Sequence, residues 1–328
     1  MIRIAARIGP QWLERPGDLA FLSSIGVEFV DVEFGVFPGF NESGGAPDRS
    51  SIGSVVDLLD GHGLRLERAN YPKTEIAPHY LGQPEAGQAI DNVCRTTELC
   101  GEFGIPVMGI QNFDAMTIHG RFVGEHSWVP GRGGYRYLHI DVESDLADAP
   151  PPPGTPTREE LWGRTVDLFG AVAPVAESAG VKVAPHGSDP PIATAGGIPQ
   201  MLTSFADFDR LFAEVPSPNV GITYCVGTRY ESGEDVFEGI RRFGGQKRIF
   251  HVHFRNVRGT IPEQRAYSEV APDEGDLNML EVARALDAQG YDGVIDYDHV
   301  MKLPGDSPGG REYIAFCIGY MRGLLANL

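Results

Sequence analysis

Two patterns of apolar residues alternate along the chain. Short runs rich in Val, Ile and aromatic residues are each followed by a longer stretch in which apolar residues recur every three or four positions. The first pattern is typical of buried strands, and the second is typical of amphipathic helices. We predict eight strands, at residues 2–8, 27–34, 64–71, 106–113, 181–186, 220–227, 249–257 and 293–300.

Helical patterns separate these strands and follow the last of them. They cover residues 17–25, 52–61, 84–103, 158–179, 204–215, 234–243, 276–289 and 313–325. Thr157 before one of them, and Ser204 and Asp276 at the start of two others, are capping residues, and Gly180 and Gly290 follow two of them as stop signals. Eight strand-then-helix units are the number in a (β/α)8 TIM barrel. An open, doubly wound sheet is the alternative, but no predicted strand leads into a Gly-x-Gly-x-x-Gly turn.

One long stretch interrupts the alternation. Residues 114–156 separate the fourth strand from its helix and include four consecutive prolines at 150–153. We expect one barrel domain over residues 1–328, with this stretch as an irregular loop insertion. Because it follows the C-terminal end of a strand, we place it on the face where barrel enzymes build their sites, as a lid, an active-site wall or a solvated loop.

Composition excludes several classes of partner. Asp and Glu outnumber Lys and Arg by 45 to 27, which gives a net charge of −18, and no concentrated basic patch offsets it. Such a surplus repels phosphate backbones and anionic lipids, so we expect no nucleic-acid or membrane partner. We also expect no transmembrane span and no secretory signal, and the four cysteines show no Cys-x-x-Cys spacing. These features predict a cytoplasmic protein, and they fit a monomer and a homo-oligomer equally.

Polar residues with metal-binding chemistry gather at the ends of the last four predicted strands. His186 ends the fifth strand and Cys225 lies near the end of the sixth, while His253 and Asp298 lie at similar depth in the seventh and eighth. Imidazole, thiolate and carboxylate groups together are typical ligands of a divalent transition metal. We therefore predict one metal ion held by these four residues. The thiolate disfavours Mg²⁺, and the free positions that a substrate needs favour Mn²⁺ over a closed zinc site, with Fe²⁺, Co²⁺ and Zn²⁺ as other ions these ligands accept.

Strand periodicity assigns directions to the neighbouring side chains. His251, His253 and Arg255 share one face of the seventh strand, because side chains alternate with a period of two. His251 lies one layer deeper than His253, where we expect a packed supporting residue. Strict alternation would turn His299 away from the barrel axis, but it lies at a strand end, where the backbone can leave regular β geometry.

The same segments resemble the mannonate dehydratase family. Residues 186–191 (His-Gly-Ser-Asp-Pro-Pro) resemble its His-Pro-Asp-Asp-Pro-Pro, residues 223–228 (Thr-Tyr-Cys-Val-Gly-Thr) its Cys-Thr-Gly-Ser, residues 253–256 (His-Phe-Arg-Asn) its His-Leu-Arg, and residues 298–299 the start of its Asp-His-Gly. The resemblance extends from about residue 161 to the end of the chain. Gly187 and Ser188 stand where the family has Pro-Asp, and Val300 stands where it has glycine.

This resemblance implies a xylose-isomerase-like barrel and a manganese-dependent lyase. In the implied reaction, D-mannonate loses water to give 2-keto-3-deoxy-D-gluconate. Matching of the motifs implies His299 and Tyr313 as proton-transfer residues and Arg255 as a residue that contacts the substrate or orients the site. We expect Asn256, in the same motif, and Lys302, as a cation near an anionic ligand, to bind the sugar acid.

Two other functions stay open at this stage. A sugar isomerase or epimerase on the same barrel would use the metal to polarise a carbonyl or hydroxyl, and a neutral sugar would need no cationic group for a carboxylate. A non-catalytic barrel could bind a metal and a sugar acid as a sensor or carrier. A non-catalytic barrel would be expected to lack the proton-transfer residues. Because both His299 and Tyr313 are present, the sequence favours an enzyme.

Overall fold

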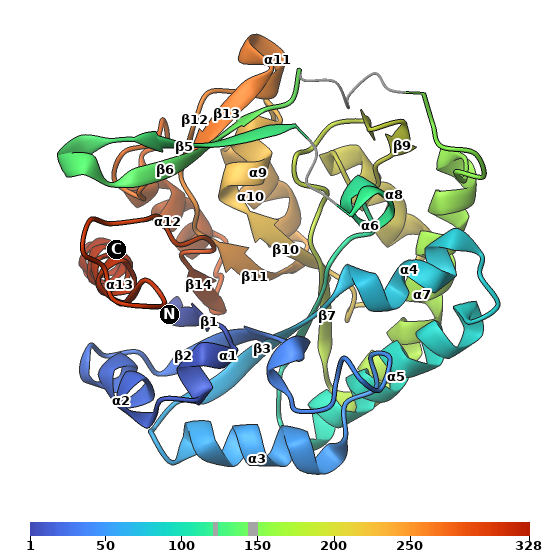
Figure 1. Ribbon diagram of the computed structural model, residues 1–328, viewed down its shortest axis with the longest axis horizontal. Coiled ribbons are helices and arrows are strands. Elements are labelled where there is room, and N and C mark those ends of the chain that lie inside the picture. Colours follow the sequence, from blue (N-terminus) through green and yellow to red (C-terminus); the bar gives the residue numbers. More distant parts are fainter. Residues whose placement is uncertain (121–123, 144–149) are drawn as a thin grey trace.

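Eight parallel strands form a barrel in the computed structural model, which describes residues 1–120, 124–143 and 150–328 (Figure 1). The barrel strands are β1 (Arg3–Ile8), β2 (Phe29–Glu33), β3 (Arg65–Tyr71), β4 (Val107–Ile110), β7 (Lys182–Pro185), β10 (Ile222–Cys225), β11 (Ile249–His253) and β14 (Val294–Asp296). They pair in the order β10-β11-β14-β1-β2-β3-β4-β7. A parallel bridge between Val183 and Val220 joins β7 to the segment before β10 and closes the ring. The predicted (β/α)8 barrel is confirmed.

Helices surround the strands on the outside of this barrel (Figure 1). The main helices are α2 (Pro16–Ser24), α3 (Arg49–Asp60), α5 (Ala86–Glu102), α7 (Arg158–Ala179), α8 (Phe205–Glu214), α10 (Val236–Gly245), α12 (Met279–Ala288) and α13 (Arg311–Leu325). Shorter ones are α1 (Pro10–Leu13), α4 (Lys73–Leu81), α6 (Ala115–His119), α9 (Val226–Glu231), α11 (Ile261–Gln264) and the 3₁₀ turns η1 (Phe34–Val36) and η2 (Arg132–Gly134). Each barrel strand is thus followed by at least one helix, as the alternating pattern predicts.

Local chemistry explains where several helices begin and end. Thr157 and Glu160 form a capping box at the start of α7, and Gly180 ends the helix in the left-handed conformation, with φ of 70°. Ser204 caps α8 as predicted. The prediction for α12 is wrong by two residues, because Asn278 caps that helix while the Asp276 carboxylate accepts a hydrogen bond from the Gly259 N–H at 2.8 Å.

The barrel interior is polar at its centre, and the apolar core lies between strands and helices. On β2, Val30 and Val32 are fully buried in the apolar core, whereas Asp31 between them pairs with Arg68 of β3. Alternation on β11 likewise separates Val252 from His251. The charged groups inside the barrel can be buried because they are paired with one another.

The described part of the segment between β4 and α7 contains regular secondary structure, so the prediction of an irregular loop is wrong. Its strands β5 (Glu125–Pro130) and β6 (Arg136–Asp141) form a hairpin. This hairpin pairs with β13 (Ala266–Glu269), which pairs with β12 (Val257–Arg258), in the antiparallel order β12-β13-β6-β5. We call these four strands the cap sheet; Figure 1 shows it as green and orange strands lying together. Residues 121–123 and 144–149 of the predicted insertion 114–156 lie outside the described residues.

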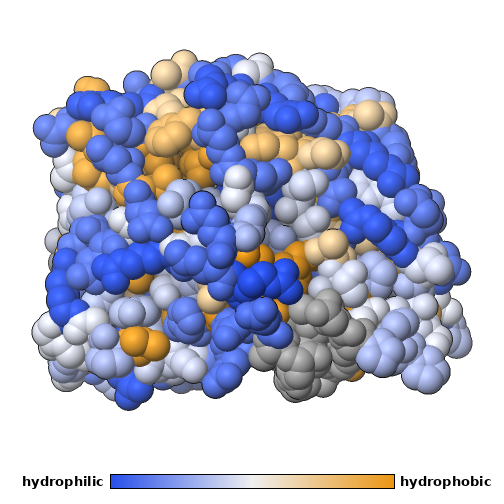
Figure 2. All heavy atoms as spheres, turned by 90° about the horizontal axis from the view of Figure 1, so that it is seen from above, coloured by the Kyte–Doolittle hydropathy of each residue, from blue (hydrophilic) through white to orange (hydrophobic). Residues whose placement is uncertain are grey.

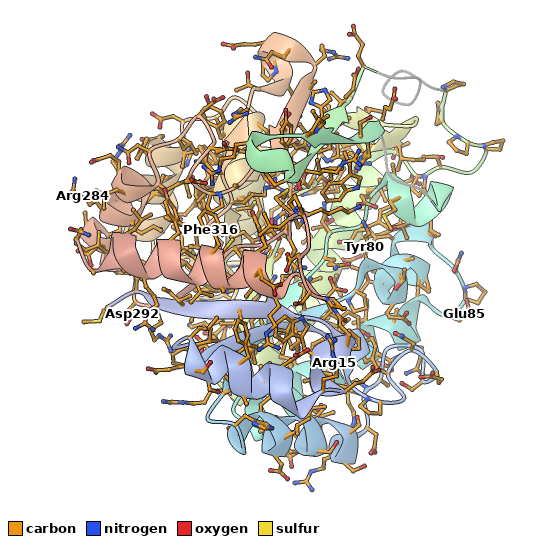
Figure 3. All side chains as sticks on the ribbon, turned by 60° about the vertical axis from the view of Figure 1, so that its left-hand side comes forward. Arg15, Tyr80, Glu85, Arg284, Asp292 and Phe316 are labelled. Atoms are coloured by element: carbon orange, nitrogen blue, oxygen red, sulfur yellow. The ribbon has the colours of Figure 1, made fainter. Side chains whose placement is uncertain are left out.

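The cap sheet lies over the C-terminal ends of the barrel strands and is attached to the loops around it. Arg132 contacts Asp273 at 2.5 and 2.9 Å, and its guanidinium lies 5.8 Å from the ring centre of Phe316. Figure 3 shows the Phe316 side chain on α13. The backbones of Arg136 and Lys302 exchange two hydrogen bonds, of 2.8 and 3.0 Å. The hairpin is therefore joined both to the last helix and to the loop after β14, on the face that the sequence predicts.

The molecular surface is mainly polar. The face in Figure 2 carries hydrophilic side chains with apolar areas between them, and the large apolar side chains that are exposed in the described chain are Met1 and Leu328.

The short strands β8 (Thr194–Ala195) and β9 (Ile198–Pro199) form a separate two-stranded hairpin after β7. Within the described ranges, no helix has the length and apolar character needed to span a bilayer.

Candidate active site and metal centre

A cavity of about 890 Å³ lies between the C-terminal ends of the barrel strands and the cap sheet. The cap sheet contributes one face to it, through residues at alternate positions of its strands. These are His126 and Trp128 of β5, Leu138 and Ile140 of β6, and Tyr267 and Glu269 of β13. The insertion therefore builds a wall of the cavity, and part of that wall is apolar.

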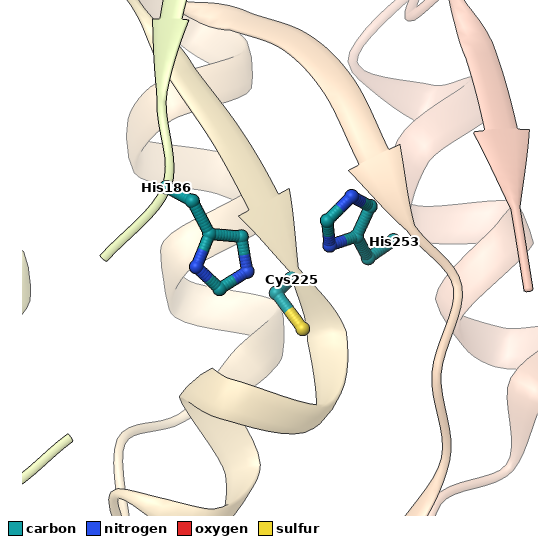
Figure 4. A group of neighbouring side chains, drawn as sticks. All are labelled: His186, Cys225 and His253. Carbon is teal, nitrogen blue, oxygen red and sulfur yellow. The ribbon is translucent and has the colours of Figure 1, made fainter. Parts of the chain in front are cut away.

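Three of the predicted metal ligands meet at the base of this cavity, where His186 and His253 line it and the buried Cys225 lies beside them. The ligand atoms of His186, Cys225 and His253 all lie within 4.8 Å of one another. His186 directly follows β7, while Cys225 and His253 are paired in register at the ends of β10 and β11. Figure 4 shows the three side chains pointing toward a common centre. Parallel neighbouring strands that end at the same level bring these residues together, as the sequence predicts.

Hydrogen bonding leaves the ligand atoms of this group available. His186 Nδ1 lies 2.6 Å from the carbonyl oxygen of Gly187, so Nδ1–H donates there and the lone pair stays on Nε2. His253 is 3% exposed, yet neither of its ring nitrogens has a hydrogen-bond partner among the described residues. Cys225 Sγ accepts the Thr228 N–H at 3.4 Å. Because buried polar groups are almost always hydrogen-bonded, His253 Nε2, which has no hydrogen bond, fits an ion bound at this point.

Burial sets the charge state of the same three groups. It lowers the pKa of His186 to about 4 and the pKa of His253 well below its usual range, so both imidazoles are neutral and can donate a lone pair. It raises the pKa of the Cys225 thiol. A divalent cation would reverse this last shift, because a coordinating thiol loses its proton. The donor set therefore fits a metal ion.

Asp298 lies beside this group. Its Oδ1 is 3.3 Å from His253 Nδ1, and its Oδ2 is 3.9 Å from Cys225 Sγ. The residue has φ of 61°, and its N–H donates to Asp296 Oδ1 at 2.8 Å. Since this left-handed residue breaks the alternation after β14, both Asp298 and His299 reach the cavity. Asp298 therefore lies beside two of the other predicted ligands, Cys225 and His253, but does not belong to the group whose ligand atoms all lie within 4.8 Å of one another.

His299 lies at the mouth of the cavity, with 43% of its side chain exposed. Its Nδ1 is 2.5 Å from Glu269 Oε2, and its Nε2 is 3.5 Å from Asp298 Oδ1. Burial alone would lower its pKa, but attraction to Asp298 and Glu269 outweighs that effect and raises the pKa to about 9. The imidazole can therefore hold or release a proton at the edge of the cavity, next to the ligand group.

Arg255 is the centre of a buried ion-pair network. Its Nη1 contacts Asp189 at 2.9 Å and Glu269 at 2.7 Å, and its Nη2 contacts Glu231 at 3.0 Å. Its side chain is 2% exposed and is not part of the cavity wall. Of its two predicted roles, orienting the site fits these contacts, because Arg255 binds the carboxylates and does not line the cavity.

The structure does not place Asn256 and Lys302 in the cavity wall, and so gives no support to the prediction that they bind substrate. The Asn256 amide donates to the carbonyl oxygens of Pro272 and Leu277, each at 3.0 Å, so it ties the loop after β13 to the strand end. Lys302 Nζ lies 3.8 Å from the ring centre of Trp128 and forms no part of the cavity wall. Lys302 instead contacts the cap sheet, through the ring of Trp128 and the backbone of Arg136.

Tyr313 is also away from the cavity. It lies in the first turn of α13 with 2% exposure, its ring packs 6.2 Å from that of Phe316, and burial raises the pKa of its hydroxyl well above the usual value. It is absent from the residues that line the cavity. The structure therefore does not bring Tyr313 to the cavity with His299, the other predicted proton-transfer residue, because the loop before α13 leaves Tyr313 in the apolar core.

The first four strands contribute cavity residues that the sequence analysis missed. Arg7 of β1 and Glu33 of β2 line the cavity, with Lys73 after β3 and Gln111 after β4. Arg7 Nη1 donates to Asp298 Oδ1 at 2.7 Å, and Gln111 Nε2 donates to Glu33 Oε1 at 3.0 Å. Each is a polar residue at or just past the end of a predicted strand, which is the same signal that identified His186.

A second buried group lies below the first. The ligand atoms of Asp31, His251, His253 and Asp296 are within 4.8 Å of one another. Here the acids already have partners, since Arg68 Nη1 contacts both oxygens of Asp31 at 3.0 and 2.9 Å and His251 Nε2 lies 2.8 Å from Asp296. His251 is therefore a buried, paired residue one layer below the predicted metal ligands, which is the position that the strand periodicity predicts for it.

Comparisons of the sequence with known proteins identify one family. The family model described as D-mannonate dehydratase (UxuA) matches residues 156–328, more than half of the chain. A protein named mannonate dehydratase 2 from Halalkalibacterium halodurans is 35% identical over 160 residues, which are 48% of this chain and 46% of that protein. Mannonate dehydratase from Thermotoga maritima is 36% identical over 159 residues, 47% of this chain and 44% of that protein. The matched segment is thus less than half as long as each relative.

Solved structures share the fold over nearly the whole chain. Mannonate dehydratase from Streptococcus suis serotype 2 superposes with a TM-score of 0.84 and 24% identity, covering 99% of this chain and 93% of the other. A xylose isomerase domain protein from Alicyclobacillus acidocaldarius superposes with a TM-score of 0.66 and 16% identity, covering 99% of both chains. The barrel is therefore of the xylose-isomerase-like type. With the family match over the segment that carries His186, Cys225, His253, Asp298 and His299, the chain belongs to the D-mannonate dehydratase family.

Proposed function

We propose that this protein is a metal-dependent hydro-lyase that converts D-mannonate to 2-keto-3-deoxy-D-gluconate and water. The observation that carries the proposal is the meeting of His186, Cys225 and His253, whose ligand atoms lie within 4.8 Å of one another. Asp298 links this group to His299, because its Oδ1 lies 3.3 Å from His253 Nδ1 and 3.5 Å from His299 Nε2. Membership of the family, and relatives named mannonate dehydratase, support the choice of reaction.

The proposed metal ligands are His186, Cys225, His253 and Asp298. An ion bound there would stabilise negative charge on the oxygens of a sugar acid. That help is needed because the proton next to a carboxylate is weakly acidic when the carboxylate is already negative. We propose Mn²⁺ as the resident ion, since a thiolate disfavours Mg²⁺ and since substrate oxygens need coordination positions that a closed zinc site lacks.

The protein's own groups supply binding and proton transfer. His299 moves a proton at Nε2, because its Nδ1 is held by Glu269. Arg7, which is 20% exposed and faces the cavity, provides the positive charge for the substrate carboxylate. Trp128 and Leu138 of the cap sheet form an apolar wall that limits water around the reacting atoms.

The test is turnover by metal-stripped protein reloaded with Mn²⁺, Mg²⁺, Co²⁺ or Zn²⁺. Each form is incubated with a panel of aldonic acids and with neutral aldoses and ketoses, and formation of the 2-keto acid is followed. We expect dehydration of D-mannonate, fastest with Mn²⁺. Conversion of neutral sugars without loss of water would instead support an isomerase or epimerase, and saturable binding of a sugar acid without any turnover would support a non-catalytic barrel.

We also propose a cytoplasmic location and the absence of a nucleic-acid partner. All four cysteines are free thiols, as expected in a reducing compartment. The net charge of −18 opposes binding to a phosphate backbone. Fractionation of cells and a nucleic-acid retention assay at low salt would test the two statements.

A further inference from the structure

We propose that Glu269, on β13 of the cap sheet, is a positioning residue that orients His299 for proton transfer. The inference deepens the proposed function and rests on it. The cap sheet would then contribute to the reaction as well as cover the cavity, because its Glu269 carboxylate binds His299, the residue that moves the proton.

The contacts of Glu269 fix it between two hydrogen-bond donors. Its Oε2 lies 2.5 Å from His299 Nδ1, and its Oε1 accepts from Arg255 Nη1 at 2.7 Å. The Glu269 side chain is 4% exposed, whereas that of His299 is 43% exposed. A buried carboxylate anchored by a buried arginine therefore holds an imidazole that is otherwise open to solvent.

This anchoring determines which ring nitrogen faces the cavity. With Nδ1–H donated to Glu269, Nε2 is the nitrogen left to meet a substrate. His299 follows the left-handed residue Asp298 and lies outside β14, so its backbone is not fixed by strand pairing. The carboxylate thus supplies an orientation that the strand does not, as partners of catalytic and metal-bound histidines commonly do.

The pairing of the cap sheet aims Glu269 at His299. Glu269 pairs with Leu138 of β6, and Ser268 pairs with His139. Tyr267 and Glu269 share the face toward the barrel, where the Tyr267 hydroxyl donates to Asp189 at 2.8 Å. Since a slip of one residue would present Ser268 in place of Glu269, the register set by the β5–β6 hairpin determines whether His299 has a partner.

The kinetic test compares Glu269→Gln, His299→Asn and the double variant with the unaltered protein loaded with Mn²⁺. Glutamine has the shape of glutamate but only one acceptor oxygen, so it cannot accept from both His299 and Arg255. We expect Glu269→Gln to lower kcat by about 10- to 100-fold, the usual scale for such partners, with KM and metal content unchanged. Glu263→Gln, an exposed change on α11, is the matched control and should match the unaltered protein.

The double variant separates positioning from an independent role. If Glu269 acts through His299, adding Glu269→Gln to His299→Asn lowers kcat no further. Wild-type kcat in Glu269→Gln, or effects that multiply in the double variant, would overturn the proposal. A fall in metal content that matches the fall in kcat would also overturn it, because Glu269 would then serve the metal site.

A second measurement needs no substrate. In Zn²⁺-loaded protein with ¹⁵N-labelled histidine, the proton between His299 Nδ1 and Glu269 should give a far-downfield proton resonance that His299→Asn removes. We expect Glu269→Gln to remove the same resonance and Glu263→Gln to keep it; its persistence in Glu269→Gln would overturn the inference. Because this readout is independent of turnover, failure of the unaltered protein to dehydrate any sugar acid would refute the proposed function while the positioning of His299 is still tested.

Discussion

The guanidinium of Arg7, near the end of the first barrel strand, donates to the carboxylate of Asp298, just past the end of the last, at 2.7 Å. The two strands are neighbours, since β1 pairs with β14. Attraction to His299, Arg255 and Arg7 outweighs burial and holds the pKa of Asp298 well below its usual range. One arginine thus serves a proposed metal ligand and also faces the cavity. A cation bound at Asp298 would compete with Arg7 for the carboxylate and leave the guanidinium to an anionic substrate.

Arg7→Gln should raise the KM for the sugar acid more than it lowers kcat. Hydrogen bonds to charged groups contribute about 1.5–3 kcal/mol, which corresponds to a rise in KM of about 10- to 100-fold. Steady-state kinetics with Mn²⁺-loaded protein measures both constants. Arg3→Gln is the control, because Arg3 lies at the opposite end of β1 and pairs with Glu67. An unchanged KM in Arg7→Gln would remove Arg7 from substrate binding.

Cys225→Ser should lower the metal content of the purified protein. A serine hydroxyl is a poorer ligand than a thiolate for a transition metal, while His186 and His253 stay in place. Elemental analysis after dialysis against a weak chelator gives the occupancy. Cys94→Ser is the matched control, since Cys94 is a half-buried thiol on α5 whose Sγ contacts the carbonyl of Ala171. Equal metal content in the two variants would contradict the proposed ligand set.

His299→Asn should keep the metal and lose turnover. Removal of a general acid or base costs about 100-fold or more in rate. Asparagine keeps a polar side chain of similar size, so the change tests proton transfer more than packing. Metal content and kcat are measured on the same preparation. Near-normal kcat at full occupancy would exclude His299 and direct the search to other groups at the cavity, with Lys73 as the first candidate.

The part of the site that the sequence predicts depends on local periodicity. His186, Cys225 and His253 end adjacent parallel strands, so alternation and strand order are sufficient to bring them together. Asp298 and His299 needed a break in that alternation. The break is the left-handed Asp298, whose N–H is held by Asp296. A strand-end position indicated that such a break could occur, and the structure supplies the hydrogen bond that produces it.

The remainder depends on pairings between distant segments. Glu269 meets His299 because β13 pairs with β6, and no local pattern encodes that pairing. Asn256 carries the same strand-end signal as Cys225, yet its amide is used by the backbone carbonyls of Pro272 and Leu277. Polar residues near strand ends therefore mark candidates, and tertiary contacts decide which of them face the cavity.

Loss of one partner of the buried Arg68–Asp31 pair, below the proposed metal centre, should lower the free energy of unfolding more than loss of both charges. Arg68→Met leaves the Asp31 carboxylate buried without its main partner, and breaking such a pair costs about 3–5 kcal/mol. Adding Asp31→Asn removes the uncompensated charge, so the double variant should be more stable than Arg68→Met alone. Urea unfolding of metal-free protein measures Arg68→Met, Asp31→Asn and the double variant. Arg65→Met, on the exposed start of β3, is the control and should change the free energy of unfolding by about 0.5 kcal/mol or less. If the decreases in the free energy of unfolding of the two single variants simply add in the double variant, Arg68 stabilises the barrel through its packing. The ion pair between Arg68 and Asp31 would then not be what stabilises the residues beneath His253.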